Sequence, residues 1–312
     1  MKKFTNFICM MVALLATLVV VSCGKAKKEG VNLYNYVVKD YQAVAKINVD
    51  KVMGDDGISE HVKKIIEESD ASKLDNLEGI KEIIIVVKDK EFPYGLIKLT
   101  VPKDEFLKNI EKSCNVKKIK VADKQAYVIA KKEAAEKETN YFYFINDKNL
   151  IASGKKGVLE EIVKEFTASP VMDNFKNNVN LQKDIKGLEK FPIWFSFRDE
   201  EAAARGTFSL PSDDNAKYVV DAEVMPSAED YDEAKKQLPG MKDMMIGMFS
   251  IAIQDPELPK KINNDLKIEF DDKTKMIKVK FAFNPKDYKG YTDKMIELSK
   301  QKEKGIPPTV TK

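Results

Sequence analysis

Few side chains in this sequence are of the types that most often do chemistry, and each has a plain structural use. His61 is the only histidine and lies among charged neighbours in a short predicted helix, so we expect a surface residue and not a zinc ligand or catalytic base. The pairs Asp213-Asp214 and Asp271-Asp272 fall in predicted turns, where aspartate is favoured because it hydrogen-bonds the backbone. A serine three residues before a lysine, as at Ser153 and Lys156, is expected by chance in a lysine-rich chain. The sequence predicts no catalytic residue, no metal and no cofactor.

The thiol of Cys23 has the clearest chemical context. Lys2-Lys3 precede an apolar run from Phe7 to Val21, and a polar stretch follows the cysteine. The run is shorter than the roughly 20 apolar residues that span a bilayer core, which favours an export signal. Two alternatives stay open at this point: a conventional signal followed by an ordinary Cys23, and an uncleaved membrane helix.

The four residues Val20-Val21-Ser22-Cys23 resemble the lipobox of bacterial lipoproteins. The resemblance implies that the cysteine is diacylated through a thioether, that the chain is cleaved before it, and that its new amine is acylated. Each buried CH₂ contributes about 0.8 kcal/mol, so two or three acyl chains hold firmly where one holds weakly. We therefore expect palmitate-type lipid on Cys23, a signal peptide over 1–22 and a lipidated tether over 23–33.

The other two cysteines carry no further chemistry. Cys9 leaves with the signal peptide, so Cys114 has no partner for an internal disulfide. We expect Cys114 to be an inert, partly buried, small apolar residue, and the alternative is a reactive thiol.

The charge balance argues against a nucleic-acid partner. Removing Lys2-Lys3 with the leader lowers the formal charge from +3 to +1. Only Arg198 and Arg205 are arginines, and basic runs such as Lys117-Lys118 have acidic neighbours, so we expect a solvated surface of interleaved charge.

The pattern of apolar residues in the first half predicts strands and hairpins with a helix after each group. Pro102 opens one predicted helix, which buries Phe106, Leu107 and Ile110. The helix over 157–166 has the clearest amphipathic period, with Val158, Leu159, Ile162, Val163 and Phe166 inward. The predicted strands are 41–48, 80–87, 94–101, 116–121, 126–131, 141–145 and 150–153, and a further helix is predicted from Ser59.

The second half of the sequence repeats this order of predicted strands and helices. Strands are predicted over 193–197, 206–210, 218–224, 266–270 and 276–283, with a short helix over 200–204. The order strand, proline, acid, helix occurs at Pro102, Pro226 and Pro285, which favours duplication. We predict an α+β fold of two tandem units of mainly antiparallel sheet covered by helices. The domains are 34–168 and 190–303, joined by a helical connector over 169–189 and followed by a flexible tail over 304–312.

This order of elements resembles a group of repeat-containing bacterial envelope lipoproteins with no assigned activity. The likeness rests on the leader, on the strand Asp40 to Asn48 and on the strand–glycine–helix step from Leu150 to Gly157. It implies a tethered envelope protein and no reaction.

A methionine-rich apolar run follows Pro239-Gly240. One interpretation is a buried helix in which flexible methionine fills gaps, and the other is an adaptable apolar groove for a lipid, peptide or partner helix. Trp194 would then either rim that groove or belong to the core. The candidate ligand-binding residues are Met241, Met244, Met245, Met248, Phe249 and Trp194.

Three functions are compatible with these observations. We favour a non-enzymatic binding or structural module of the cell envelope, anchored through Cys23 to a bacterial bilayer. Gly24 and lysines follow the cysteine in place of an acid, which favours the outer membrane and its periplasmic face. The alternatives are a carrier or chaperone for an apolar ligand, and a hydrolase whose two carboxylates are remote in the sequence.

Overall fold

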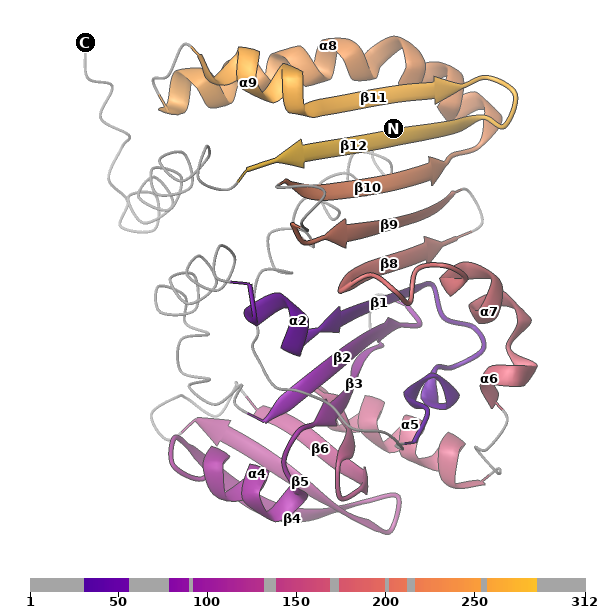
Figure 1. The fold of residues 1–312 in the computed structure, drawn as a ribbon. Helices are drawn as coiled ribbons and strands as arrows, with labels where there is room; N and C mark the ends of the chain where they lie inside the picture. Colours follow the sequence, from indigo (N-terminus) through magenta and orange to yellow (C-terminus); the bar gives the residue numbers. More distant parts are fainter. Residues whose placement is uncertain are drawn as a thin grey trace. The chain divides into compact units, whose positions relative to one another are not determined.

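A computed structural model describes residues 31–55, 79–89, 92–131, 139–168, 174–199, 202–211, 217–253 and 257–284 (Figure 1). Three predicted parts of the chain lie outside the described residues. They are Cys23 with the predicted tether up to Gly30, the helix predicted from Ser59, and the tail. The chain forms two compact units, Met1–Thr207 and Phe208–Lys312, which are described separately below.

The described strands form one antiparallel sheet of twelve strands, in the order β11-β12-β10-β9-β8-β1-β2-β3-β7-β6-β5-β4 (Figure 1). The prediction of an α+β fold of two tandem units was therefore wrong, because a single sheet dominates. The reason lies in β1 (Ala43–Asn48) and β8 (Ile193–Arg198), the first strands of the two predicted units. They pair antiparallel, with Ala45 opposite Phe195. Local periodicity identified both strands but could not tell that they are neighbours.

The strands of the first unit follow the predicted hydrophobic runs closely. The hairpin over 80–87 and 94–101 is confirmed as β2 and β3, with Ile84 opposite Leu96. The predicted short helix over 200–204 was wrong, because β9 begins at Ala203 and crosses the boundary between the units. The remaining strands are β2 (Ile80–Val87), β3 (Pro93–Leu99), β4 (Cys114–Val121), β5 (Lys124–Lys131), β6 (Thr139–Asn146), β7 (Asn149–Ser153) and β9 (Ala203–Ser209).

One face of this part of the sheet is covered by short helices and by α5 (Lys156–Ala168). All five predicted core residues of α5 are buried, which confirms its amphipathic period. Leu159 and Trp194 belong to the same hydrophobic core. The other helices that contribute to this core are η1 (Leu33–Tyr36), α6 (Asn174–Asn177) and α7 (Val179–Ile185).

The opposite face carries α4 (Lys103–Ile110). Its Phe106 ring meets Phe144 edge-on, with centroids 6.3 Å apart, and the three predicted core residues of α4 are buried. Pro102 is the residue before the first helical turn and not its first residue. The short helix α2 (Val49–Met53) follows β1 and is capped by the side chain of Asn48, which accepts from the Lys51 amide.

A tight turn joins β4 and β5. Ala122 and Asp123 both have positive φ, at 48° and 59°, and Val121 pairs directly with Lys124. This geometry is a two-residue type I′ turn, whose twist matches that of the flanking strands. The sequence analysis expected a four-residue connection, because neither residue is the glycine or asparagine that usually marks this turn.

The described part of the second unit contains three strands and two helices besides the end of β9. The helix α8 (Ala228–Ile253) runs through Pro239 as one helix of 26 residues, where the sequence analysis expected two segments. The helix α9 (Leu258–Asp265), which was not predicted, leads into the last hairpin. The strands are β10 (Tyr218–Met225), β11 (Leu266–Asp271) and β12 (Met276–Phe283).

Candidate functional site

The predicted ligand-binding residues divide between the two units. Trp194 is fully buried in the first unit, where its ring stacks on Tyr34 with centroids 6.3 Å apart. The methionine-rich run lies in α8 of the second unit, and of this run Ile246 is buried. The side chains of Met241, Met244, Met245, Met248 and Phe249 lie outside what the structure describes. The groove therefore stays a prediction.

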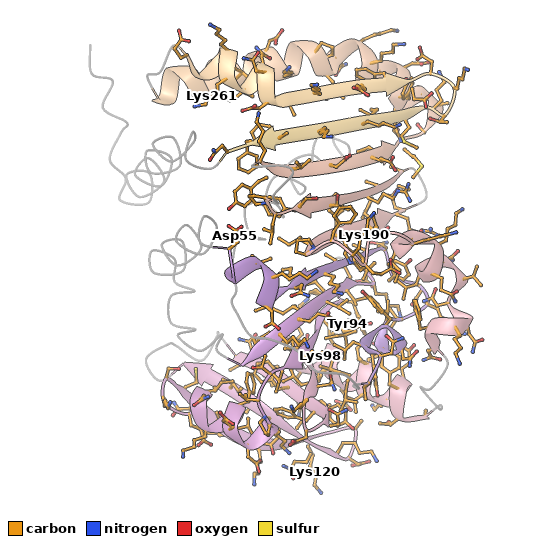
Figure 2. All side chains as sticks on the ribbon, viewed as in Figure 1. Asp55, Tyr94, Lys98, Lys120, Lys190 and Lys261 are labelled. Atoms are coloured by element: carbon orange, nitrogen blue, oxygen red, sulfur yellow. The ribbon has the colours of Figure 1, made fainter. Side chains whose placement is uncertain are left out.

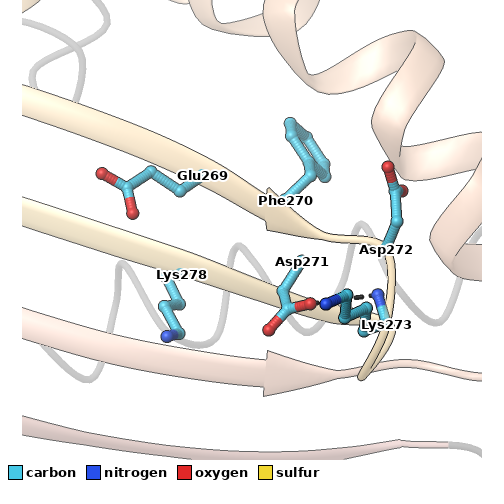
Figure 3. Close-up of a pocket in the computed structure, with 6 residues that line it drawn as sticks. All are labelled: Glu269, Phe270, Asp271, Asp272, Lys273 and Lys278. Atoms are coloured by element: carbon cyan, nitrogen blue, oxygen red, sulfur yellow. Dashed lines mark hydrogen bonds between the residues drawn. The ribbon is translucent and has the colours of Figure 1, made fainter.

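A shallow pocket of about 430 Å³ lies beside the β11–β12 turn of the second unit (Figure 3). It contains Asp271-Asp272, the carboxylate pair singled out in the sequence, together with two lysines and a third acid. Cross-strand pairing explains part of the set, because Glu269 of β11 lies opposite Lys278 of β12. The lining residues are Glu269, Phe270, Asp271, Asp272, Lys273 and Lys278.

Asp272 holds the start of α8 against the β11–β12 turn. It accepts hydrogen bonds from the Tyr231 hydroxyl at 3.0 Å and from the Lys235 ammonium at 2.6 and 2.7 Å. Lys275, in the same turn, pairs with Asp232 at 3.1 Å and lies 4.8 Å from the centre of the Tyr231 ring. The Tyr231 ring is buried against Phe270, so these charges surround the contact between helix and turn.

The two aspartates of the turn are held in the charged form. Hydrogen bonds from Thr274 and from the Lys273 amide lower the pKa of Asp271, and those from Lys235 and Tyr231 lower the pKa of Asp272. Burial and the bond to Asp272 raise the pKa of Tyr231 to about 12. A glycosidase acid needs the opposite shift, because it must hold its proton near neutral pH. The arrangement at this turn suits charge pairing and not proton transfer.

A second cluster of charged groups lies in the first unit. The Asp184 carboxylate of α7 accepts a hydrogen bond from the Tyr41 hydroxyl at 2.5 Å and pairs with the Arg198 guanidinium of β8. Burial first, and then the bond to Asp184, raise the pKa of Tyr41. These bonds join α7 to the sheet, so Asp184 has a structural role that the sequence analysis missed.

A buried lysine in β1 was also not predicted from the sequence. Lys46 is only 9% exposed and pairs with Glu82 of β2 at 3.1 Å. It lies between Ala45 and Ile47 in β1, whose side chains are also buried, so both faces of this strand are buried. A lysine between Ala45 and Ile47 is typical of a strand with one face in solvent, and the sequence held no signal that a partner acid lies on β2.

The lysines of β4 depart from the expectation of neutralised basic runs. Lys117-Lys118 and Lys120 are exposed, and within the described residues none of them forms an ion pair. Cys114, at the start of the same strand, is a free thiol and is buried, where partial burial was predicted.

Two further properties of the described residues concern metal binding and membrane spans. No group of three or more histidine, cysteine, aspartate or glutamate side chains in this part of the chain could hold a metal ion. Among the described helices, none combines the length and apolar character needed to cross a membrane.

The chain matches no protein-family model, and no curated protein or solved structure is significantly similar to it. Its function must therefore be argued from its own residues.

Proposed function

We propose that the protein is a lipid-anchored extracytoplasmic lipoprotein that serves as a non-enzymatic binding or structural module of a bacterial cell envelope. The observation that carries the proposal is the leader, in which a basic start and an apolar run end in Val20-Val21-Ser22-Cys23. A thiol at this position is where lipid attachment would replace the removed apolar helix as the anchor. Gly24 and the lysines after it favour the outer membrane and its periplasmic face.

The contacts in the described units support the non-enzymatic part of the proposal. Asp272 and Asp184 each hold a helix to the sheet, and the Lys46 ammonium is paired with a carboxylate. Catalytic acids and bases need a pKa near the working pH, whereas hydrogen bonds lower the pKa of Asp271 and Asp272 from ordinary values that are already acidic. These groups therefore stabilise contacts between elements.

The lipid anchor is tested by metabolic labelling with palmitate in a bacterial host. We expect label in the wild-type protein and none in Cys23→Ser, because the thioether needs the sulfur. The matched control is Cys114→Ser, which removes a buried thiol elsewhere in the chain and should leave labelling unchanged. Equal labelling of wild type and Cys23→Ser, or none in the wild type, would refute the anchor.

Native mass spectrometry distinguishes the proposed binding or structural module from a carrier of an apolar ligand. The sample is the mature chain, residues 23–312, with Cys23→Ser. We expect the mass of the polypeptide alone. A co-purified apolar molecule that is lost when Met244, Met245 and Met248 are replaced by glutamine would favour the carrier.

A further inference from the structure

The outermost described strand of the first unit, β4, carries exposed lysines on both faces of the sheet, because successive side chains of a strand alternate between the faces. β4 is the last strand in the order of the sheet, so one of its edges has no strand partner among the residues that the structure describes. Lys117, Lys118 and Lys120 are exposed along β4, and Lys124 is exposed just after the turn. Figure 2 shows Lys120 at the margin of this unit. We call these four lysines the basic edge; within the described residues none of them forms an ion pair.

The basic edge belongs to a segment that is more positive than the chain as a whole. Residues 103–124, which run from α4 through β4 to the turn, contain seven lysines and four acids, a net charge of +3. The mature chain carries about +1, so the rest of it is slightly negative. A local excess of this kind attracts anionic surfaces over about a Debye length, close to 10 Å in moderate salt.

The chain enters the first unit through the same hydrophobic core that lies under the basic edge. Leu33, the last residue of the predicted tether, belongs with Val37 and Val38 to a buried cluster that also contains Val121 and Ala126 of the β4–β5 hairpin. From Cys23 to Val31 the chain has eight peptide steps, which reach at most about 28 Å when extended. A lipid on Cys23 would therefore hold this unit close to the bilayer.

We infer that the basic edge docks on anionic phospholipid headgroups, with Lys117, Lys118 and Lys120 as the principal contacts. The inference rests on the proposed function, because the lipid on Cys23 would bring the basic edge to the bilayer and raise its local concentration there. The lysines of the tether lie between the anchor and the edge in sequence and add charge of the same sign. The contact fixes which side of the first unit faces the membrane.

Lysines on an edge strand have another well-known use, which is to block pairing with a second copy of the strand. The two roles predict different failures. Loss of a membrane contact weakens binding to anionic vesicles and leaves the protein monomeric, whereas loss of edge protection causes self-association.

The test uses the mature chain, residues 23–312, with Cys23→Ser, so that no acyl chain contributes to binding. Its cosedimentation with mixed phosphatidylcholine–phosphatidylglycerol vesicles is compared with that on pure phosphatidylcholine, at low and at high salt. The edge variant is Lys117→Gln, Lys118→Gln and Lys120→Gln. The matched control is Lys236→Gln, Lys260→Gln and Lys267→Gln, three exposed lysines of the second unit that remove the same charge.

We expect binding only to the anionic vesicles, abolished by high salt and weakened about 100-fold in the edge variant, since each lysine near such a surface contributes about a factor of five. The control triple should stay within about twofold of the parent, because its lysines belong to the second unit and are not part of the basic edge. Circular dichroism and light scattering confirm that the edge variant is folded and monomeric.

Equal weakening by both triples, binding to neutral vesicles, absence of binding, or self-association of the edge variant would each overturn the inference. Because the assay uses unacylated protein, its result is separate from that of palmitate labelling. Loss of palmitate labelling would refute the lipid anchor alone, and loss of vesicle binding would refute the membrane contact of the basic edge alone.

Discussion

Replacing Asp184 with alanine should destabilise the first unit by about 3 kcal/mol. The Asp184 side chain is 10% exposed, and its carboxylate accepts a hydrogen bond from the Tyr41 hydroxyl and forms an ion pair with the Arg198 guanidinium. Breaking a fully buried ion pair costs about 3–5 kcal/mol. Because the Arg198 side chain is 34% exposed and water can solvate it, we expect loss of this pair to lower the free energy of unfolding by about 2 kcal/mol. A buried hydroxyl that loses its acceptor adds about 1 kcal/mol.

The assay is urea unfolding at neutral pH, followed by fluorescence. Trp194 is the only tryptophan, is fully buried, and lies on β8, the strand that carries Arg198. Its emission therefore reports the unit that the substitution affects. Tyr41→Phe provides the matched control, since it removes one hydroxyl and keeps the ring, and should cost about 1 kcal/mol.

A double-mutant cycle of Asp184→Ala with Arg198→Met tests whether the pair itself is responsible. We expect the double variant to be more stable than the sum of the single changes by about 1 kcal/mol or more, because removing both charges leaves neither unpaired. A loss below about 0.5 kcal/mol for Asp184→Ala, or strict additivity in the cycle, would refute this reasoning.

Three other changes test separate parts of the fold. Leu159→Ala empties a fully buried site of α5 and should cost about 2–5 kcal/mol in the same urea assay. Asp123→Gly should stabilise the β4–β5 hairpin by about 0.5 kcal/mol, seen as a higher urea midpoint, because glycine adopts the positive φ of 59° without strain. Lys235 and Tyr231 lower the pKa of Asp272, so this carboxylate stabilises the fold above its ordinary pKa of 3.8 and loses that effect as the pH falls through its folded value. Urea midpoints of wild type and Asp272→Asn should therefore differ at neutral pH and converge below pH 3.8; a constant difference would contradict the assignment.

The sequence predicted most individual elements of the described residues. The stripe of Val158, Leu159 and Phe166 identified α5, and the run of β-branched residues over 80–87 identified β2. In each element the buried face determines where apolar residues occur, so the pattern can be recognised within a short stretch of sequence. The β9 strand was missed because Ala203 and Ala204 favour helix and only their place in the sheet decides otherwise.

The pairing of strands could not be obtained in this way. Similar steps of strand, proline and acid made the second half resemble a repeat, and a repeat suggests separate units. Whether β1 pairs with β8 depends on contacts between residues about 150 positions apart, such as Ala45 and Phe195, that no local window contains. For the same reason the partners of Lys46 and Asp184 were not predicted.

The segment after the tether is fastened to the sheet by hydrogen bonds as well as by burial. The Tyr94 hydroxyl of β3 accepts from the Val38 amide at 3.0 Å and donates to the Tyr36 carbonyl at 2.8 Å, and burial raises the pKa of this tyrosine. Tyr41, a few residues further on, is held by Asp184. A pull on a lipid at Cys23 would thus reach β3 and α7 within about ten residues of the first described position. A firm attachment here is what a tethered module needs if its basic edge is to keep one orientation towards the membrane.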